Sequence, residues 1–271
     1  MGNPLITAEE LQHNLQQTVL FDCRFFLQDP KLGEQAYSQG HIPTARYAHL
    51  ERDMSAPVQE HGGRHPLPDP QQFAEWLGSQ GVGIDTPVVT YDDSHLAYAS
   101  RLWWMMQALG YSLVQVLDGG LDAWRALRGE LDTRAVTPVA VTPANVKGYT
   151  NCLDIQALRE SMNRPMVLID SREEKRYQGL EEPIDPIAGH IPGAVNYPWA
   201  SVTDERGACL GAEAQLERWQ QLELERDIVV YCGSGVTACV NLLSLSIAGR
   251  QASLYAGSWS DWCSYIDRTK D

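Results

Sequence analysis

One of the six cysteines in this chain has neighbours that suit chemistry at sulfur. Cys232 directly follows the apolar run IVVY at 228–231 and precedes a glycine-rich segment and an apolar helical pattern. Its side chain would therefore stand at the carboxyl end of a buried strand, the edge at which open α/β sheets bind ligands. A loop that opens a helix presents backbone N–H groups to a negative charge, and such a position lowers the pKa of a thiol. Cys232 is accordingly the candidate nucleophile.

The residues after this cysteine suit a loop that surrounds an anionic sulfur. Gly233 and Gly235 allow the backbone to turn tightly and leave the sulfur accessible. Ser234 and Thr237 add hydroxyl donors, and the backbone N–H groups of such a loop can surround the side chain. The competing interpretation is an inert core cysteine, which is the commoner role of a cysteine that ends an apolar strand.

Other cysteine chemistries fit the sequence less well. A phosphatase loop requires an arginine six residues after the cysteine to grip phosphate, and that position is Ala238. No histidine follows Cys232, which argues against a Cys–His protease. No two cysteines are spaced as C-x-x-C, so neither a zinc site nor a dithiol redox pair is indicated. We expect no metal, nucleotide or flavin cofactor.

The chain repeats itself, and the repeats identify the elements that position this loop. Four sequence blocks occur twice in the same order, so we infer a duplicated domain rather than a solenoid of short units. Where the second copy has Cys232, the first has Asp92. The paired blocks are LFDCRF and LIDSRE (20–25 and 168–173), GHIPTA and GHIPGA (40–45 and 189–194), 87–105 and 227–245, and 116–124 and 254–262.

These blocks predict an α/β fold. VVTY and IVVY are short β-branched and aromatic runs, typical of buried parallel strands, and apolar helical patterns follow them. Strands that alternate with helices predict parallel sheets flanked by helices. The proline-containing, non-periodic stretch at 138–149 is expected to be a linker. We therefore predict a first domain at 1–137 and a second, which carries Cys232, at 150–271.

Composition narrows the class of protein. The formal net charge of −14 argues against nucleic-acid binding, and a small anionic substrate would need local basic groups. No run approaches the roughly 18 apolar residues of a membrane span. The N-terminal MGNPLITAEELQ lacks the features of a secretory signal. We expect a cytoplasmic protein with no membrane and no nucleic-acid partner.

The quoted motifs resemble a known family. Two tandem copies of D-x-R, G-H-I-P-x-A and a strand–loop–helix unit are similar to the tandem-domain rhodaneses over essentially the whole chain. In that family the first domain is inactive and the second carries the catalytic cysteine, which matches Asp92 and Cys232. The loop CGSGVTAC at 232–239 resembles the 3-mercaptopyruvate sulfurtransferase branch, whereas the thiosulfate branch typically has Arg and Lys after the cysteine. The resemblance implies two tandem rhodanese-like domains.

The resemblance also implies sulfur transfer without a cofactor. The Cys232 thiolate would take sulfur from 3-mercaptopyruvate, release pyruvate and become a persulfide. A thiol acceptor such as thioredoxin or glutathione, or cyanide, would then remove the outer sulfur, so the kinetics should be ping-pong. Ser234 matches the family's proton-relay serine, and Arg176 matches the arginine that grips the substrate carboxylate. The anionic sulfurs would be held by backbone N–H groups of Gly233, Gly235, Val236 and Thr237.

Two positions depart from the family pattern. The branch usually has a second arginine nine residues after the first, and here that residue is Asp185. It also has an aspartate from the first domain eight residues after the GHIP histidine. Here that residue is His49, which we expect to move protons or, when protonated, to bind the anion. These departures affect the identity of the donor more than sulfur transfer itself. The basic residues that could complete the carboxylate clamp include Arg24, Arg46 and Arg64.

Three alternatives stay open. Asp185 favours a thiosulfate:cyanide sulfurtransferase, while Gly233 and Ser234 argue against it. A non-enzymatic persulfide carrier would pass sulfur between proteins with negligible small-molecule turnover, and a pseudoenzyme would pass none. The oligomeric state and the physiological acceptor are open as well. A regulatory disulfide from Cys232 to Cys239 or Cys263 depends on their distance in space.

Overall fold

A computed structural model of the chain describes residues 2–222 and 227–266. The chain forms two compact units. Each unit includes one short segment from the other half of the chain, and we call Pro57–Pro66 and Thr203–Leu210 the exchanged segments. Unit 1 comprises Met1–Ala56, Leu67–Thr150 and Thr203–Leu210, and unit 2 comprises Pro57–Pro66, Asn151–Val202 and Gly211–Asp271.

Unit 1 contains a parallel sheet of five strands in the order β1-β5-β4-β2-β3. In sheet order the strands are β1 (Leu5–Ile6), β5 (Val114–Leu117), β4 (Val88–Tyr91), β2 (Val19–Asp22) and β3 (Arg46–Tyr47). The helices are α1 (Ala8–Asn14), η1 (Leu15–Gln17), α2 (Lys31–Gln39), α3 (Leu50–Asp53), α4 (Pro70–Ser79), α5 (Ala99–Ala108) and α6 (Gly120–Ala126).

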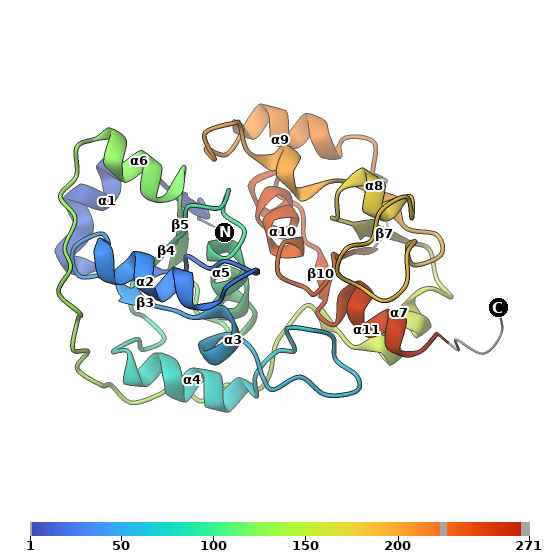
Figure 1. The fold of residues 1–271 in the computed structure, drawn as a ribbon, viewed down its shortest axis with the longest axis horizontal. Helices are drawn as coiled ribbons and strands as arrows, with labels where there is room; N and C mark the ends of the chain where they lie inside the picture. The colour runs from blue at the N-terminus through green and yellow to red at the C-terminus, as the bar shows by residue number, and fades with distance from the viewer. Residues whose placement is uncertain (1, 223–226, 267–271) are drawn as a thin grey trace. The chain divides into compact units, whose positions relative to one another are not determined.

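Unit 2 repeats this topology with a parallel sheet in the order β6-β10-β9-β7-β8. The strands are β6 (Cys152–Leu153), β10 (Ser253–Tyr255), β9 (Asp227–Tyr231), β7 (Met166–Asp170) and β8 (Val195–Asn196). The helices are α7 (Ile155–Ser161), α8 (Glu174–Tyr177), η2 (Trp199–Val202), α9 (Ala212–Trp219), α10 (Ala238–Ile247) and α11 (Ser258–Ser264). The predicted α/β fold, with two parallel sheets flanked by helices, is confirmed (Figure 1).

The middle strand of each sheet is deeply buried. All four residues of β4 are buried, and so are the last four of β9, because helices cover both faces of these sheets. In unit 1, α5 packs against β4 and β5, and in unit 2, α10 packs against β9 and β10 (Figure 1). The middle strand and its following helix therefore hold the loop between them on a rigid base.

The D-x-R and GHIP motifs connect neighbouring strands. In unit 1, Arg24 forms a buried ion pair with Asp22 at 2.6 Å and donates to the Gly40 carbonyl at 2.8 Å. The Tyr91 hydroxyl at the end of β4 donates to Asp22 at 2.8 Å and accepts from the Ile42 N–H at 3.2 Å. These motifs thus fix the carboxyl end of the middle strand. Unit 2 repeats the arrangement with Asp170, Arg172, Gly189, Tyr231 and Ile191.

The stretch at 138–149 contains neither helix nor strand, as expected of a linker. Val141 donates its N–H to the Gly78 carbonyl at 2.9 Å, so this stretch lies along α4 of unit 1. The domain boundaries at 137 and 150 stay a prediction. The exchanged segments had no signal in the repeats, because they depend on where long loops fold back rather than on local sequence. Within the described ranges, no helix is both long and apolar enough to cross a membrane.

Candidate active site

Cys232 lies at the carboxyl end of β9, where only 2% of its surface is exposed. Its N–H donates to the Ser258 hydroxyl at 3.1 Å, and its carbonyl accepts from the Trp259 N–H at 3.0 Å. The Gly233 carbonyl accepts from the Ser260 N–H at 2.9 Å. The start of α11 therefore fixes the backbone of the cysteine and of the residue that follows it.

Gly235 is required by the shape of this loop. Its φ is +74°, in the left-handed region that favours glycine. A Cβ atom at this position would lie 2.2 Å from the Ala256 carbonyl oxygen, a distance that backbone atoms cannot tolerate. The loop can therefore pass close to the backbone after β10 only if this residue has no side chain.

Gly235→Ala is expected to slow persulfide formation on Cys232 by about 100-fold, the usual cost of moving reacting groups by about 1 Å. Gly249→Ala is the matched control, because Gly249 has nearly the same φ, +71°, but open space around its Cβ position. Single-turnover mass spectrometry measures both rates. Equal rates in the two variants would contradict the proposed clash.

Four backbone donors of the Cys232 loop have no protein acceptor in the described part of the chain. They are the N–H groups of Gly233, Ser234, Val236 and Thr237, all of which precede α10. Buried or half-buried N–H groups are nearly always paired, so such a set indicates a place for an anion.

The first repeat shows what this type of loop binds. Asp92 ends β4, and its buried carboxylate accepts from the N–H groups of Ser94 (2.8 Å), Leu96 (3.1 Å), Tyr98 (2.9 Å) and Ala99 (2.8 Å). Burial raises the pKa of Asp92, and these hydrogen bonds oppose that shift. The loop after the middle strand of unit 1 is thus an anion-binding loop whose anion belongs to the chain itself.

A persulfide on Cys232 would resemble that carboxylate in length. The outer sulfur of a persulfide and a carboxylate oxygen of aspartate both stand two bonds from Cβ. In the repeat alignment Ser234 and Val236 correspond to Ser94 and Leu96, whose N–H groups hold Asp92. The second loop offers these donors but its own side chain is a thiol, so the anion can be a transferred sulfur.

Ser234 has a partner that the sequence analysis missed. Its hydroxyl lies 2.8 Å from Nδ1 of His65, whose side chain is buried. His65 comes from the exchanged segment Pro57–Pro66, which belongs to unit 2. The string GGRHP at 62–66 was the available signal, a histidine beside glycines and an arginine in a long loop, but its sequence distance from Ser234 concealed the pairing.

Two arginines lie against the next loop residue, Gly233. A Cβ atom on Gly233 would lie 3.0 Å from Nη2 of Arg64 and 3.5 Å from Nη2 of Arg176. Both guanidinium groups pair with the Asp185 carboxylate, and Arg176 also pairs with Glu182 at 2.8 Å. Burial lowers the pKa of Arg64, while the negative charge of the Cys232 thiolate opposes that shift. Cationic groups thus lie beside the residue that follows the Cys232 thiol.

His49 has a structural role in unit 1. Its Nδ1 accepts from the N–H groups of Glu51 and Arg52, both at 3.2 Å, and so caps α3. Its ring packs edge-on against Phe25 with centroids 5.2 Å apart. Its participation in proton transfer or anion binding stays a prediction. The other predicted site residues are gathered in unit 2: Arg176, Cys232, Gly233, Ser234, Gly235, Val236 and Thr237.

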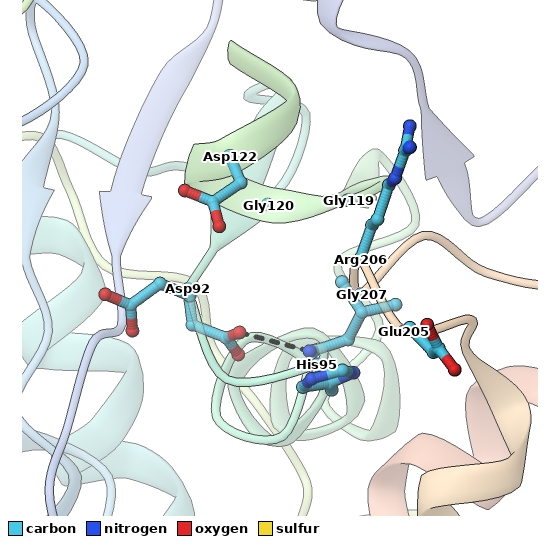
Figure 2. Close-up of a pocket in the computed structure, with 10 residues that line it drawn as sticks. Asp92, His95, Gly119, Gly120, Asp122, Glu205, Arg206 and Gly207 are labelled. Atoms are coloured by element: carbon cyan, nitrogen blue, oxygen red, sulfur yellow. Dashed lines mark hydrogen bonds between the residues drawn. The ribbon is translucent and has the colours of Figure 1, made fainter. Parts of the chain in front are cut away.

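The corresponding place in unit 1 is a small acidic cavity beside Asp92, of about 80 Å³. Figure 2 shows its lining, to which the exchanged segment Thr203–Leu210 contributes one wall. Three further carboxylates line it besides Asp92, so an anionic donor would be repelled there. The lining residues are Asp92, Asp93, His95, Leu96, Gly119, Gly120, Asp122, Glu205, Arg206 and Gly207. Among the residues that the structure describes, no cluster of metal-ligating side chains occurs.

Comparison with known proteins places both units in one family. The family model for the rhodanese-like domain matches twice, at residues 7–127 and 154–265. A Pseudomonas aeruginosa protein named "probable 3-mercaptopyruvate sulfurtransferase" is 42% identical over 95% of this chain and 94% of its own length. A thiosulfate sulfurtransferase of Gallus gallus is 32% identical over 97% of this chain and 94% of its own length. The crystal structure of SseA from Escherichia coli, described as a 3-mercaptopyruvate sulfotransferase, superposes with a TM-score of 0.81 at 28% identity, over 96% of this chain and 100% of that one.

Proposed function

This chain belongs to the rhodanese family in its tandem-domain form, and on that premise we propose that it transfers sulfur from 3-mercaptopyruvate through a persulfide on Cys232. One observation carries the proposal. The thiol follows the middle strand of unit 2. It lies beside two guanidinium groups and beside a loop in which the N–H groups of Gly233, Ser234, Val236 and Thr237 lack an acceptor within the described ranges. Sulfur transfer needs this combination: a nucleophile, hydrogen-bond donors that stabilise anionic sulfur, and cationic groups that bind the donor's carboxylate.

The first half-reaction forms the persulfide. The Cys232 thiolate attacks the thiol sulfur of 3-mercaptopyruvate, and the bond between that sulfur and C3 breaks. Its electron pair leaves on C3 as the enolate of pyruvate, which takes up a proton and departs. The persulfide ionises in the loop, where backbone N–H groups hold the outer sulfur as an oxyanion hole holds oxygen.

Ser234 and His65 supply the proton for the leaving enolate. With a proton on Nδ1 of His65, the ring donates to the Ser234 hydroxyl oxygen across 2.8 Å. The serine can then give its own proton to C3 of the enolate and take the Nδ1 proton in exchange, and solvent restores the proton on the ring. Sulfur transfer releases a carbanion, and a proton donor in the same loop removes that unstable charge.

His65→Gln is expected to lower kcat by about 100-fold, the low end of the range for general acid–base groups. It should also flatten the limb of the pH–rate profile that reports this histidine, which a purely structural role would not do. His61→Gln is the matched control, because His61 lies in the same segment but bonds Ser264 at the surface. An unchanged pH profile in His65→Gln would contradict the relay.

The second half-reaction passes the outer sulfur to an acceptor. A thiolate of thioredoxin, glutathione or another small thiol, or cyanide, attacks the outer sulfur, and the Cys232 thiolate leaves. Reduced thiols are abundant in the cytoplasm, and we propose that the protein works there. Cell fractionation tests the location, and sulfur transfer to each purified acceptor identifies the preferred one.

The competing donor is thiosulfate, which the similarity to the Gallus gallus enzyme favours. Steady-state kcat/KM with each donor, at saturating cyanide, decides between them. A larger value for 3-mercaptopyruvate supports the proposal, and a larger value for thiosulfate refutes the choice of donor. Negligible turnover with both, together with persulfide transfer from a partner protein, would identify a carrier.

A further inference from the structure

Asp261 of α11 has no carboxylate counterpart in the first repeat, where the aligned residue is Ala123. Its side chain is buried, with 4% of the residue's surface exposed. One oxygen accepts from the Gly62 N–H at 2.7 Å, and the other accepts from the Tyr255 hydroxyl at 2.6 Å. Burial and the Asp261 carboxylate raise the pKa of Tyr255, so the tyrosine keeps the proton that it donates. Asp261 therefore joins the exchanged segment Pro57–Pro66 to the end of β10.

The exchanged segment follows the first turn of α11 closely. The Arg64 N–H donates to the Ser260 hydroxyl at 3.1 Å. A Cβ atom on Gly63 would lie 2.4 Å from the Gly257 carbonyl oxygen and 2.7 Å from the Ser260 hydroxyl. This close approach requires a glycine, which also adopts the φ of +80° found here. Residues 62–64 are therefore fixed on the helix at both ends.

The same turn of α11 holds the Cys232 loop. The N–H of Ser260 donates to the Gly233 carbonyl at 2.9 Å, while its hydroxyl accepts from the exchanged segment. His65 is the next residue of that segment, and its Nδ1 lies 2.8 Å from the Ser234 hydroxyl. One helix turn thus sets the distance between the nucleophile's loop and the histidine of the relay.

We propose that Asp261 is a positioning residue for the proton relay, which fixes the exchanged segment so that His65 stays within hydrogen-bond distance of Ser234. The inference rests on the proposed function and adds a residue that acts through His65. Two anchors precede this histidine, the Gly62 and Arg64 N–H groups. Hydrogen bonds to a carboxylate are about twice as strong as those between neutral groups, so Asp261 holds the stronger anchor.

Asp261→Ala, which copies the first repeat, is expected to slow persulfide formation from 3-mercaptopyruvate by about 10- to 100-fold, since misplacing a reacting group by about 1 Å costs about 100-fold. Sulfur transfer from the preformed persulfide to cyanide should stay within a few-fold of wild type, because that half-reaction takes no proton from His65. In the His65→Gln background, Asp261→Ala should slow persulfide formation only slightly further. Single-turnover mass spectrometry and thiocyanate formation measure the two half-reactions.

Three further variants make the result specific to positioning. Asp261→Asn keeps an oxygen for the Gly62 N–H and should form persulfide within a few-fold of the wild-type rate. Tyr255→Phe is the matched control, because it removes the other hydrogen bond of the same carboxylate and should leave the rate near wild type. Ser260→Ala removes the second anchor at a half-buried site and should slow the same half-reaction, which tests the inference even if Asp261→Ala does not fold.

Three kinetic outcomes would overturn the inference. Equal losses in both half-reactions would mean that Asp261 merely supports the Cys232 loop. Losses that add fully to those of His65→Gln would mean that Asp261 does not act through the histidine. A loss in Asp261→Asn as large as that in Asp261→Ala would mean that the hydrogen bond to Gly62 is not what matters.

Hydrogen exchange of the backbone amides at 57–66 tests the anchoring without turnover. Asp261→Ala should raise exchange in this segment by about 10-fold, the effect of losing one hydrogen bond, and leave the amides of β9 unchanged. Unchanged exchange at 57–66 overturns the inference. A wild type that forms no persulfide, but whose segment loses protection in Asp261→Ala, would refute the proposed function and leave the anchoring by Asp261 standing.

Discussion

Replacing Cys232 by serine is expected to lower turnover with either donor by about 10⁴-fold or more, the order seen when a catalytic nucleophile is removed. A serine hydroxyl fits the same space but stays protonated near neutral pH and cannot store sulfur as a persulfide. Thiocyanate formation from cyanide measures the loss. Fold and donor binding should persist, because the loop is fixed by backbone hydrogen bonds to Ser258, Trp259 and Ser260.

Two companion variants make this result specific. Cys209→Ser removes a half-buried cysteine of unit 1 and should leave turnover near the wild-type level. Asp92→Cys in the Cys232→Ser background should not restore activity, since the cavity beside residue 92 is lined by carboxylates. Substantial residual turnover in Cys232→Ser, or rescue by Asp92→Cys, would mean that another cysteine carries the sulfur.

Asp22→Asn is expected to lower the free energy of unfolding of unit 1 by about 3–5 kcal/mol, the usual cost of removing one partner of a buried ion pair. Arg24 would keep its charge with only 3% of its side chain exposed and with its carboxylate partner gone. The Tyr91 hydroxyl would also lose its charged acceptor. Urea denaturation followed by tryptophan fluorescence measures the change.

Asp132→Asn is a closely matched comparison for this variant. Asp132 and Arg134 form an ion pair with the same two-residue spacing in the same unit, at 2.7 Å, but 87% of the arginine side chain is exposed. Water screens that pair, so its removal should cost far less. If the two variants lose similar stability, burial is not what makes the Asp22–Arg24 pair important.

The fold was predictable because its determinants are local and occur twice. VVTY and IVVY form the buried residues of the middle strands β4 and β9, as β-branched runs in parallel sheets should. The GHIP and D-x-R motifs form one hydrogen-bonded network, which connects the end of β2 or β7 to the tyrosine that ends the middle strand. The exchanged segments were not predictable, because long loops without periodic patterns carry no signal of the unit that they join.

The site was predictable only in part, for the same reason. Cys232 and its loop occupy consecutive positions, so strand, glycines and helix start could be inferred together. His65 and Arg64 approach that loop from an exchanged segment more than a hundred residues away in sequence. Asp185 looked like a lost arginine, whereas in the structure it bridges Arg176 to Arg64. The role of Asp185 depends on its contact with Arg64, which is distant in sequence, so no local pattern could predict it.

Cys232 itself is expected to carry the transferred sulfur. The most direct test is to incubate the reduced protein with 3-mercaptopyruvate and, separately, with thiosulfate, and to weigh the intact protein by mass spectrometry. We expect a gain of one sulfur, about 32 Da, faster with 3-mercaptopyruvate and absent in Cys232→Ser. If neither donor adds sulfur to the reduced wild-type protein, or if Cys232→Ser gains it equally, Cys232 does not carry the transferred sulfur.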